Sequence, residues 1–124
     1  MNMNLRIVLP AIITATFMCL QGYSQWLNSP SGVSSSVQSV YFTDVNTGYA
    51  SCNGGSILKT TNQGASWTLQ TSGTTNDLFE LNFPAPDTGY GVGYLGTIVK
   101  TTDGGVSWTT LNSGTNLQFN SVWF

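Results

Sequence analysis

The residues whose types could support catalysis are two carboxylates, Glu80 and Asp87, which lie seven positions apart. A pair of carboxyl groups, one acting as an acid and the other as a base or nucleophile, hydrolyses glycosidic bonds. The surrounding sequence favours other roles, because Glu80 falls in a predicted strand and Asp87 in a predicted turn. Asn46 occupies the position equivalent to Asp87 in a sequence repeat described below. We therefore expect Asp87 to form the turn, and we predict no catalytic residue and no enzymatic activity.

Other reactive constellations are limited by composition. The chain has no histidine, which excludes Ser-His-Asp and Cys-His nucleophiles and imidazole metal ligands from this sequence. Cys52 is the only cysteine after residue 24, and we expect it to be a small buried hydrophobe rather than a reactive thiol. Residues 91–96 read G-x-G-x-x-G, but a dinucleotide site needs a helix after the glycines, and residues 97–101 predict a strand. No metal and no cofactor are predicted.

Charge excludes a further class of partner. After residue 24 the only cations are Lys59 and Lys100, and with five carboxylates they leave a net charge of −3. Nucleic-acid binding requires several cationic side chains to neutralise phosphates, so we predict no nucleic-acid partner. The two lysines share one position of the repeat and could form a small ring of cations in a larger assembly. Solvated lysines at strand ends are the simpler interpretation.

A 41-residue repeat must position these residues. Trp26, Trp67 and Trp108 follow one another at this spacing, and residues 43–83 align without a gap on residues 84–124 with 16 of 41 positions identical. A fixed period of this length indicates copies of one structural unit that pack against each other.

Each period predicts four short strands separated by Gly- and Asn-rich turns, with no apolar spacing of helical period. In the first complete unit we expect strands at residues 37–42, 49–52, 57–61 and 66–70. Four antiparallel strands that recur every 40–50 residues are typical of β-propeller blades. The predicted fold is therefore all-β, with blades of four antiparallel strands. A β-sandwich is the alternative, but it would not need a strict repeat.

The N-terminal residues resemble a secretory signal peptide. Arg6 precedes an apolar run over residues 7–20, and small residues precede Gln25. A membrane anchor is the alternative, but this run is shorter than the roughly 20 residues needed to cross a bilayer. We predict cleavage after residue 24, no membrane span afterwards, and a secreted, cell-surface or periplasmic location.

The predicted organisation follows from the phase of the repeat. The signal peptide covers residues 1–24, and a partial propeller covers the rest: an outer strand over 25–36, blades over 37–77 and 78–115, and the first strand of a further blade over 116–124. Closed propellers have about 4–8 blades. We therefore predict an incomplete ring that belongs to a longer protein, with assembly of several copies as the alternative if the chain is complete.

One motif gives the repeat a family resemblance. Residues 101–108, TTDGGVSW, resemble the Asp-box or bacterial neuraminidase repeat, and residues 60–67 match it with an amide in the acidic position. The wider pattern resembles the photosystem II stability/assembly factor-like β-propellers. We expect the motif to be structural: the acidic or amide group accepts backbone N–H bonds, glycine permits positive φ, and tryptophan covers the hairpin. Carbohydrate stacking on tryptophan is the alternative. The candidate residues are Thr60, Asn62, Gly64, Ser66, Trp67, Thr101, Asp103, Gly105, Ser107 and Trp108.

The favoured function is a secreted or cell-surface, non-catalytic module that binds a protein or a glycan. The resemblance implies two alternatives: a sialidase-like or other glycoside hydrolase with its catalytic residues in other blades, and a photosystem II assembly factor. Sialidases of this family need an arginine cluster, and the sequence has no arginine after residue 24.

Overall fold

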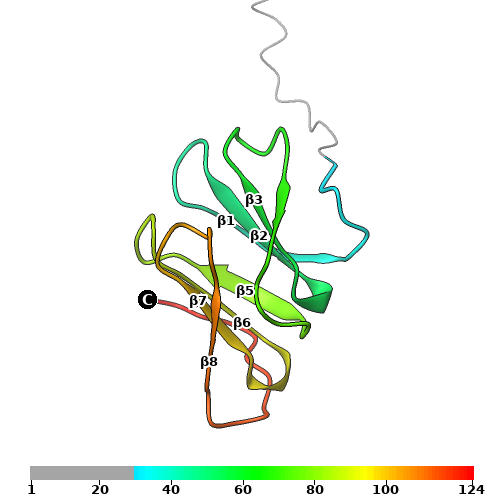
Figure 1. Ribbon diagram of the computed structural model, residues 1–124, viewed down its shortest axis with the longest axis vertical. Helices are drawn as coiled ribbons and strands as arrows, with labels where there is room; N and C mark the ends of the chain where they lie inside the picture. Colours follow the sequence, from blue (N-terminus) through cyan, green and yellow to red (C-terminus); the bar gives the residue numbers. More distant parts are fainter. Residues whose placement is uncertain (1–29) are drawn as a thin grey trace, which may run out of the picture.

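The computed structural model describes residues 30–124, which form two four-stranded antiparallel sheets (Figure 1). Each of the two predicted repeat units forms one sheet, so the all-β prediction is confirmed. The predicted signal peptide and Trp26 lie outside the described residues.

The two sheets have the same strand order, with each strand paired to the next in the sequence. The first sheet contains β1 (Val37–Phe42), β2 (Gly48–Cys52), β3 (Ile57–Thr60) and β4 (Thr68–Gln70), with the 3-10 turn η1 (Asn53–Gly55) between β2 and β3. The second contains β5 (Leu78–Asn82), β6 (Gly89–Gly93), β7 (Ile98–Thr101) and β8 (Thr109–Leu111), with η2 (Tyr94–Gly96) between β6 and β7.

Local turn chemistry explains why the strands reverse where they do. Between β1 and β2, the Asp44 carboxylate accepts hydrogen bonds from the backbone N–H groups of Asn46 and Thr47 at 2.7 and 2.9 Å. These bonds hold the pKa of Asp44 below its usual value. In η1, Gly54 has a φ of 70°, a conformation that glycine adopts without steric cost.

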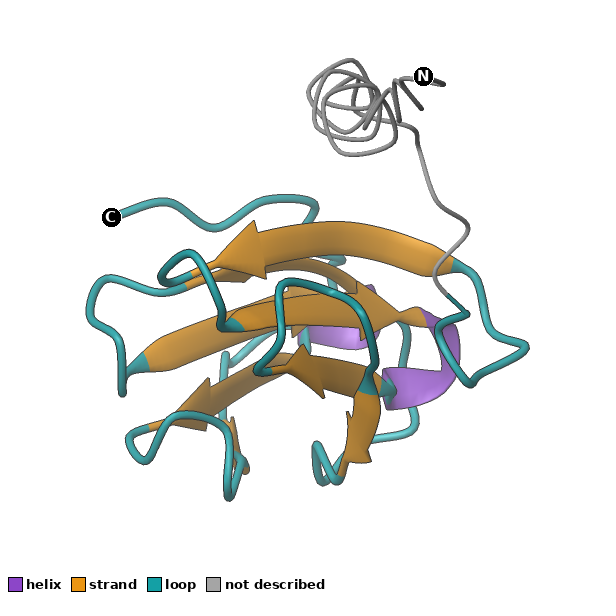
Figure 2. Ribbon diagram, turned by 90° about the horizontal axis from the view of Figure 1, so that it is seen from above, coloured by secondary structure: helices purple, strands orange, loops and turns teal. Residues whose placement is uncertain are grey.

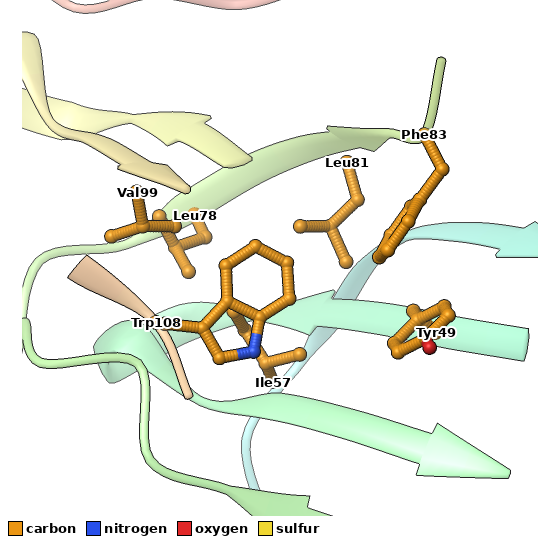
Figure 3. Packing of buried hydrophobic residues seen from close by; sticks show 7 residues of the cluster. All are labelled: Tyr49, Ile57, Leu78, Leu81, Phe83, Val99 and Trp108. Carbon is orange, nitrogen blue, oxygen red and sulfur yellow. The ribbon is translucent and has the colours of Figure 1, made fainter. Parts of the chain in front are cut away.

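The two sheets pack against each other and share one hydrophobic core (Figures 1 and 2). The inner strand β5 of the second sheet contacts both β1 and β2 of the first sheet. The core cluster consists of Tyr49, Ile57, Leu78, Leu81, Phe83, Val99 and Trp108 (Figure 3). Because both sheets contribute to it, burial of these side chains is what joins the two repeat units.

Of the two flanking strands predicted from the repeat, the first lies largely outside the described residues and the second is not paired within them. Residues 30–36 contain no strand, and the positions equivalent to β4 would be 27–29, outside the described residues. Residues 116–124 also contain no strand, because a first strand pairs with the second strand of its own unit and no described segment provides one.

Residues 116–124 nevertheless follow the path of a first strand along the second sheet, where they are red in Figure 1. The Val122 N–H donates to Glu80 Oε2 at 2.6 Å, and 41 residues earlier the Leu81 N–H donates to Ser39 Oγ at 3.1 Å. The repeat therefore sets the position of this segment even though no strand ladder forms.

Candidate functional site

The motif residues of the second sheet form a closed turn between β7 and β8, here called box turn 2 (residues 101–108). The Thr101 hydroxyl donates to Asp103 Oδ1 at 2.8 Å and accepts the Gly105 N–H at 2.9 Å. Asp103 also accepts the backbone N–H and the hydroxyl of Ser107, at 2.9 and 2.6 Å. Gly105 has a φ of 81°, as the motif predicts. The side chains of Thr101 and Asp103 thus satisfy backbone donors that a tight turn leaves unpaired.

Box turn 1 (residues 60–67) has the same network with an amide in place of the carboxylate. Thr60 Oγ1 donates to Asn62 Oδ1 at 2.9 Å and accepts the Gly64 N–H at 3.0 Å, and Asn62 Oδ1 accepts the Ser66 N–H at 2.9 Å. The difference lies in one bond: Asn62 Nδ2 donates to Ser66 Oγ at 2.8 Å, whereas in box turn 2 the serine is the donor. Asparagine therefore supports the same turn without a charge.

Box turn 2 changes the acidity of its carboxyl group. The hydrogen bonds from the Ser107 hydroxyl, the Ser107 N–H and the Thr101 hydroxyl lower the pKa of Asp103 to about 2. The group is exposed, so hydrogen bonding rather than burial sets the shift. Asp103 is ionised near neutral pH and is committed to the turn.

The two motif tryptophans have different surroundings. Trp108 is buried in the shared core, with its ring edge-on to Phe83 at a centroid distance of 6.0 Å (Figure 3). Its Nε1 has no hydrogen-bond partner among the described residues. Trp67 makes the equivalent contact with Phe42 at 6.3 Å but is only half-buried. Trp108 is occupied by core packing, and no described feature pairs Trp67 with a sugar-binding polar group.

One contact between the two sheets involves a positively charged side chain, Lys59. The Tyr49 hydroxyl and Lys59 Nζ both donate to the backbone carbonyl of Gly104 in box turn 2, each at 2.7 Å. Lys59 Nζ also lies 5.5 Å from the centre of the Tyr49 ring. Sequence reasoning treated Lys59 as a solvated or ring-forming cation and did not predict this contact. The available signal was that both repeats carry a tyrosine and a lysine in facing positions of neighbouring strands.

Two polar grooves occupy equivalent positions in the two sheets. The first has a volume of about 610 Å³ and lies between residues 54–56 and the segment 69–76. The second, about 300 Å³, lies between residues 95–98 and the segment 110–116. Both are lined by Thr74 and Asn76, so the grooves adjoin. Hydroxyl and amide groups predominate in the lining, and no charged side chain contributes to either groove.

Comparison with known proteins identifies the fold. No family model matches the sequence, and no curated protein matches it. A solved structure described as "YCF48 bound to D1 peptide" is similar, with a TM-score of 0.59 and 21% identity over 72% of this chain. A second, described as an ancestral GH74 enzyme, has a TM-score of 0.53 and 19% identity over 66% of this chain. Both are β-propellers. The chain folds as two blades of a β-propeller.

The chain spans 31% of the first propeller and 14% of the second, so it corresponds to less than a third of either. At these identities the likeness establishes the fold and not the activity. Blade 1 is the sheet β1–β4 with its connection (residues 37–77), and blade 2 is the sheet β5–β8 with its connection (residues 78–115).

The two carboxylates whose types could support catalysis, Glu80 and Asp87, make hydrogen bonds in separate parts of the propeller. Glu80 Oε2 accepts the Val122 N–H. Asp87 lies in the turn between β5 and β6, where its carbonyl accepts the Gly104 N–H at 2.8 Å and its carboxylate accepts the Thr88 hydroxyl at 3.0 Å. The structure therefore places Asp87 in the turn that the repeat predicts.

The remaining candidate chemistry also has structural roles. Cys52 is fully buried, and burial raises the pKa of its thiol, which disfavours the reactive thiolate. Residues 91–96 cover the end of β6 and all of η2, and the strand β7 follows them. Within residues 30–124, no group of three or more His, Cys, Asp or Glu side chains is placed to hold a metal ion.

Proposed function

We propose that this chain is a non-catalytic, exported propeller module that binds an extended, uncharged segment of a protein partner. The observation that carries the proposal is the pair of adjoining grooves, repeated from blade to blade and joined at Thr74 and Asn76. An extended peptide presents N–H and C=O groups at regular intervals, and hydroxyl and amide side chains can both donate to and accept from them. The exposed side chains of Leu69, Leu95 and Leu111 offer apolar contacts along the same grooves.

The cost of removing water from a charged side chain predicts that the bound segment is uncharged. A charged side chain bound in these grooves would lose water without gaining an opposite charge, because the lining supplies none. A peptide ligand in the similar propeller YCF48 supports a protein partner over a glycan.

One observation supports a non-catalytic role: every Asp and Glu side chain in the described residues is a hydrogen-bond acceptor within the fold. Each of the five accepts at least one hydrogen bond from a backbone N–H or a hydroxyl of this chain: Asp44, Asp77, Glu80, Asp87 and Asp103. These bonds give each of the five carboxylates a structural role in the fold.

Export is the part of the proposal that rests on the sequence of residues 1–24. The described residues include no helix of the length and hydrophobicity needed to cross a membrane.

The experiment is NMR titration of the isotope-labelled protein with uncharged decapeptides of Ser, Thr, Asn and Val. We expect shifts of the groove amides, including those of Thr74 and Asn76. Peptides with Lys or Glu at alternate positions should bind at least tenfold more weakly. Thr71→Arg, which adds bulk to the first groove, should abolish binding, whereas Thr61→Arg, on an exposed residue outside both grooves, should not.

Two results would overturn this proposal. Binding that is insensitive to Thr71→Arg would place the ligand elsewhere on the molecule. Shifts of the groove amides caused by a neutral oligosaccharide such as cellohexaose, and by none of the peptides, would make glycan the ligand class.

A further inference from the structure

The interface between the two blades defines two complementary surfaces. The front face of blade 2 consists of Leu78, Leu81, Phe83 and Trp108, and it packs on the back face of blade 1, which consists of Tyr49, Ile57 and Lys59. The Tyr49 ring stacks on Phe83 with a centroid distance of 4.1 Å. Box turn 2 adds the Gly104 carbonyl, which receives the two hydrogen bonds from Tyr49 and Lys59. The front face of blade 2 and the back face of blade 1 therefore bury each other's apolar side chains, and the Gly104 carbonyl accepts the hydrogen bonds of Tyr49 and Lys59.

The front face of blade 1 also has apolar residues at the equivalent positions, but three of the four are exposed. Its members, 41 positions earlier, are Val37, Val40, Phe42 and Trp67. Val37, Val40 and Phe42 are 45%, 53% and 44% exposed, whereas their blade 2 equivalents are 0%, 2% and 4% exposed. An apolar surface of this kind, rimmed by polar residues, marks an interaction site.

The back face of blade 2 is the matching half. Its members are Tyr90, Ile98 and Lys100, each half-buried. Lys100 Nζ lies 5.2 Å from the centre of the Tyr90 ring, close to the 5.5 Å of the Lys59–Tyr49 pair. No described residue supplies a carbonyl to Tyr90 or Lys100, although the same two side chain types share one in blade 1. These two donors therefore remain available to an acceptor from another molecule.

We propose that the front face of blade 1 from a second copy of this chain docks on the back face of blade 2. The carbonyl of Gln63 in box turn 1 then receives the hydrogen bonds from Tyr90 and Lys100. Gln63 has a φ of 62° and Gly104 a φ of 66°, so the two box turns have the same backbone conformation at this position. Phe42 of the second copy stacks on Tyr90 as Phe83 stacks on Tyr49. The docked interface continues the interface that the chain already contains.

The second copy must displace residues 116–124. Phe124 contacts the Tyr90 ring at a centroid distance of 4.8 Å and so occupies the place of Phe42. Two hydrogen bonds also hold the segment, from the Phe119 N–H to the Gly93 carbonyl and from the Val122 N–H to Glu80. The segment forms no strand, and Trp123 is 86% exposed. An incoming blade brings a completed sheet and a box turn, which residues 116–124 lack.

Such a contact is heterologous, since it joins two different faces of identical chains. Heterologous contacts generate closed rings when the rotation between copies closes and open filaments when it does not. Association should therefore be concentration-dependent and should extend beyond dimers.

The test uses two complementary variants, produced from the full sequence in an exporting host and studied by sedimentation velocity. Val40→Glu places a charge on the front face, and Lys100→Glu replaces the donor on the back face with an acceptor. Each variant alone should be monomeric at tenfold the concentration at which the unmodified protein associates. Mixed in equal amounts, they should form a 1:1 dimer and nothing larger, because one intact front face and one intact back face remain.

Controls separate this interface from nonspecific association. Val106→Glu, on a side chain that is 78% exposed and outside both faces, should leave association unchanged. Unmodified protein that stays monomeric at millimolar concentration would overturn the proposal, as would a mixture of the two variants that forms no dimer. Circular dichroism of each variant shows whether it remains folded, and a variant that unfolds is replaced by Phe42→Ser or Tyr90→Ala.

A third variant tests whether a second copy of the chain displaces residues 116–124 from the back face of blade 2. Phe124→Ala weakens the hold of residues 116–124 on Tyr90, so it should strengthen association of the second copy about tenfold. If association instead weakens, the segment is part of the interface as the first strand of a further blade, and docking by a second copy's blade 1 is wrong.

Discussion

Blade 1 and blade 2 have nearly the same local structure but different surroundings. Their box turns have matching hydrogen bonds, although one depends on Asn62 and the other on Asp103. Their tryptophans make similar contacts with a phenylalanine at the end of the first strand, Phe42 in β1 and Phe83 directly after β5, yet Trp108 is buried and Trp67 is half-buried. Within residues 30–124, the front face of blade 2 is covered by blade 1, whereas no blade covers the front face of blade 1. The repeat sequence therefore specifies each turn locally, while the neighbouring blade determines how much each equivalent side chain contributes to stability.

The largest difference should appear at the tryptophans. Trp108→Ala removes a buried ring from the shared core, and large-to-small changes of this kind cost about 3–5 kcal/mol. Trp67→Ala removes a half-buried ring and should cost less than half as much. The measurement is urea unfolding of the two variants at micromolar concentration, followed by tryptophan fluorescence and circular dichroism. Equal losses would show that the blades fold as separate units.

The indole nitrogen gives this comparison a control. Trp108 Nε1 is buried without a partner among the described residues, so Trp108→Phe loses area but no hydrogen bond. It should therefore retain more than half of the stability that Trp108→Ala loses.

The second-largest difference should appear at the glycines of the box turns. Gly64 and Gly105 both have positive φ, 84° and 81°, so alanine at either position costs roughly 1–2 kcal/mol in backbone strain. At Gly105 an added Cβ would also lie 2.8 Å from Tyr49 Cε1, whereas at Gly64 the nearest atom is 3.6 Å away, in Trp67. Gly105→Ala should therefore be the more destabilising of the two in thermal unfolding. A Tyr49→Ala background, which removes the clash, should bring the two costs together.

The local parts of the structure could be predicted from the sequence because they depend on residues close in the chain. Residues 37–42 form β1 with the expected bounds, and Thr60, Asn62 and Ser66 meet within one turn. The contact of Lys59 with Gly104 could not be predicted, because it joins residues 45 positions apart and depends on the angle between two sheets.

The adjoining grooves could not be predicted for a similar reason. They arise where the turn η1 and the connection after β4 leave space between them, and the repeat pattern specifies these segments without specifying their separation. The strand expected over 116–124 is not paired in the described chain for a different reason: its residues have the right phase in the repeat, but a strand requires a partner and residues 30–124 provide none.

A smaller difference should appear at the tyrosines of the back faces. Tyr49→Phe removes the partly buried hydrogen bond to Gly104, which should cost about 1 kcal/mol and leave the carbonyl with Lys59 alone. Tyr90→Phe should have almost no effect on the monomer, because its hydroxyl donates to no described residue. Chemical denaturation at a concentration below association measures both. A loss at Tyr90 equal to that at Tyr49 would mean that this hydroxyl already has an acceptor in the monomer.

The smallest difference should appear in the pH dependence of the box turns. The pKa of Asp103 falls from 3.8 to about 2 on folding, so its ionised form favours the native state at pH values above about 4. That contribution should be lost as the pH falls from about 4 to about 2. Asp103→Asn gives box turn 2 the amide of box turn 1 and should remove this contribution, whereas Asn62→Asp should add a second one in blade 1. The measurement is the urea midpoint of the three proteins between pH 7 and pH 2.

Asp44 provides a common background in this experiment, because the bonds from Asn46 and Thr47 lower its pKa in all three proteins. Differences between the three proteins in the pH dependence of the urea midpoint therefore come from the box turns. If Asn62→Asp shows the same pH dependence as the unmodified protein, blade 1 does not hold a carboxylate as blade 2 does. The equivalence of the two turns would then depend on the amide, because Asn62 Nδ2 donates to Ser66 a bond that a carboxylate can only accept.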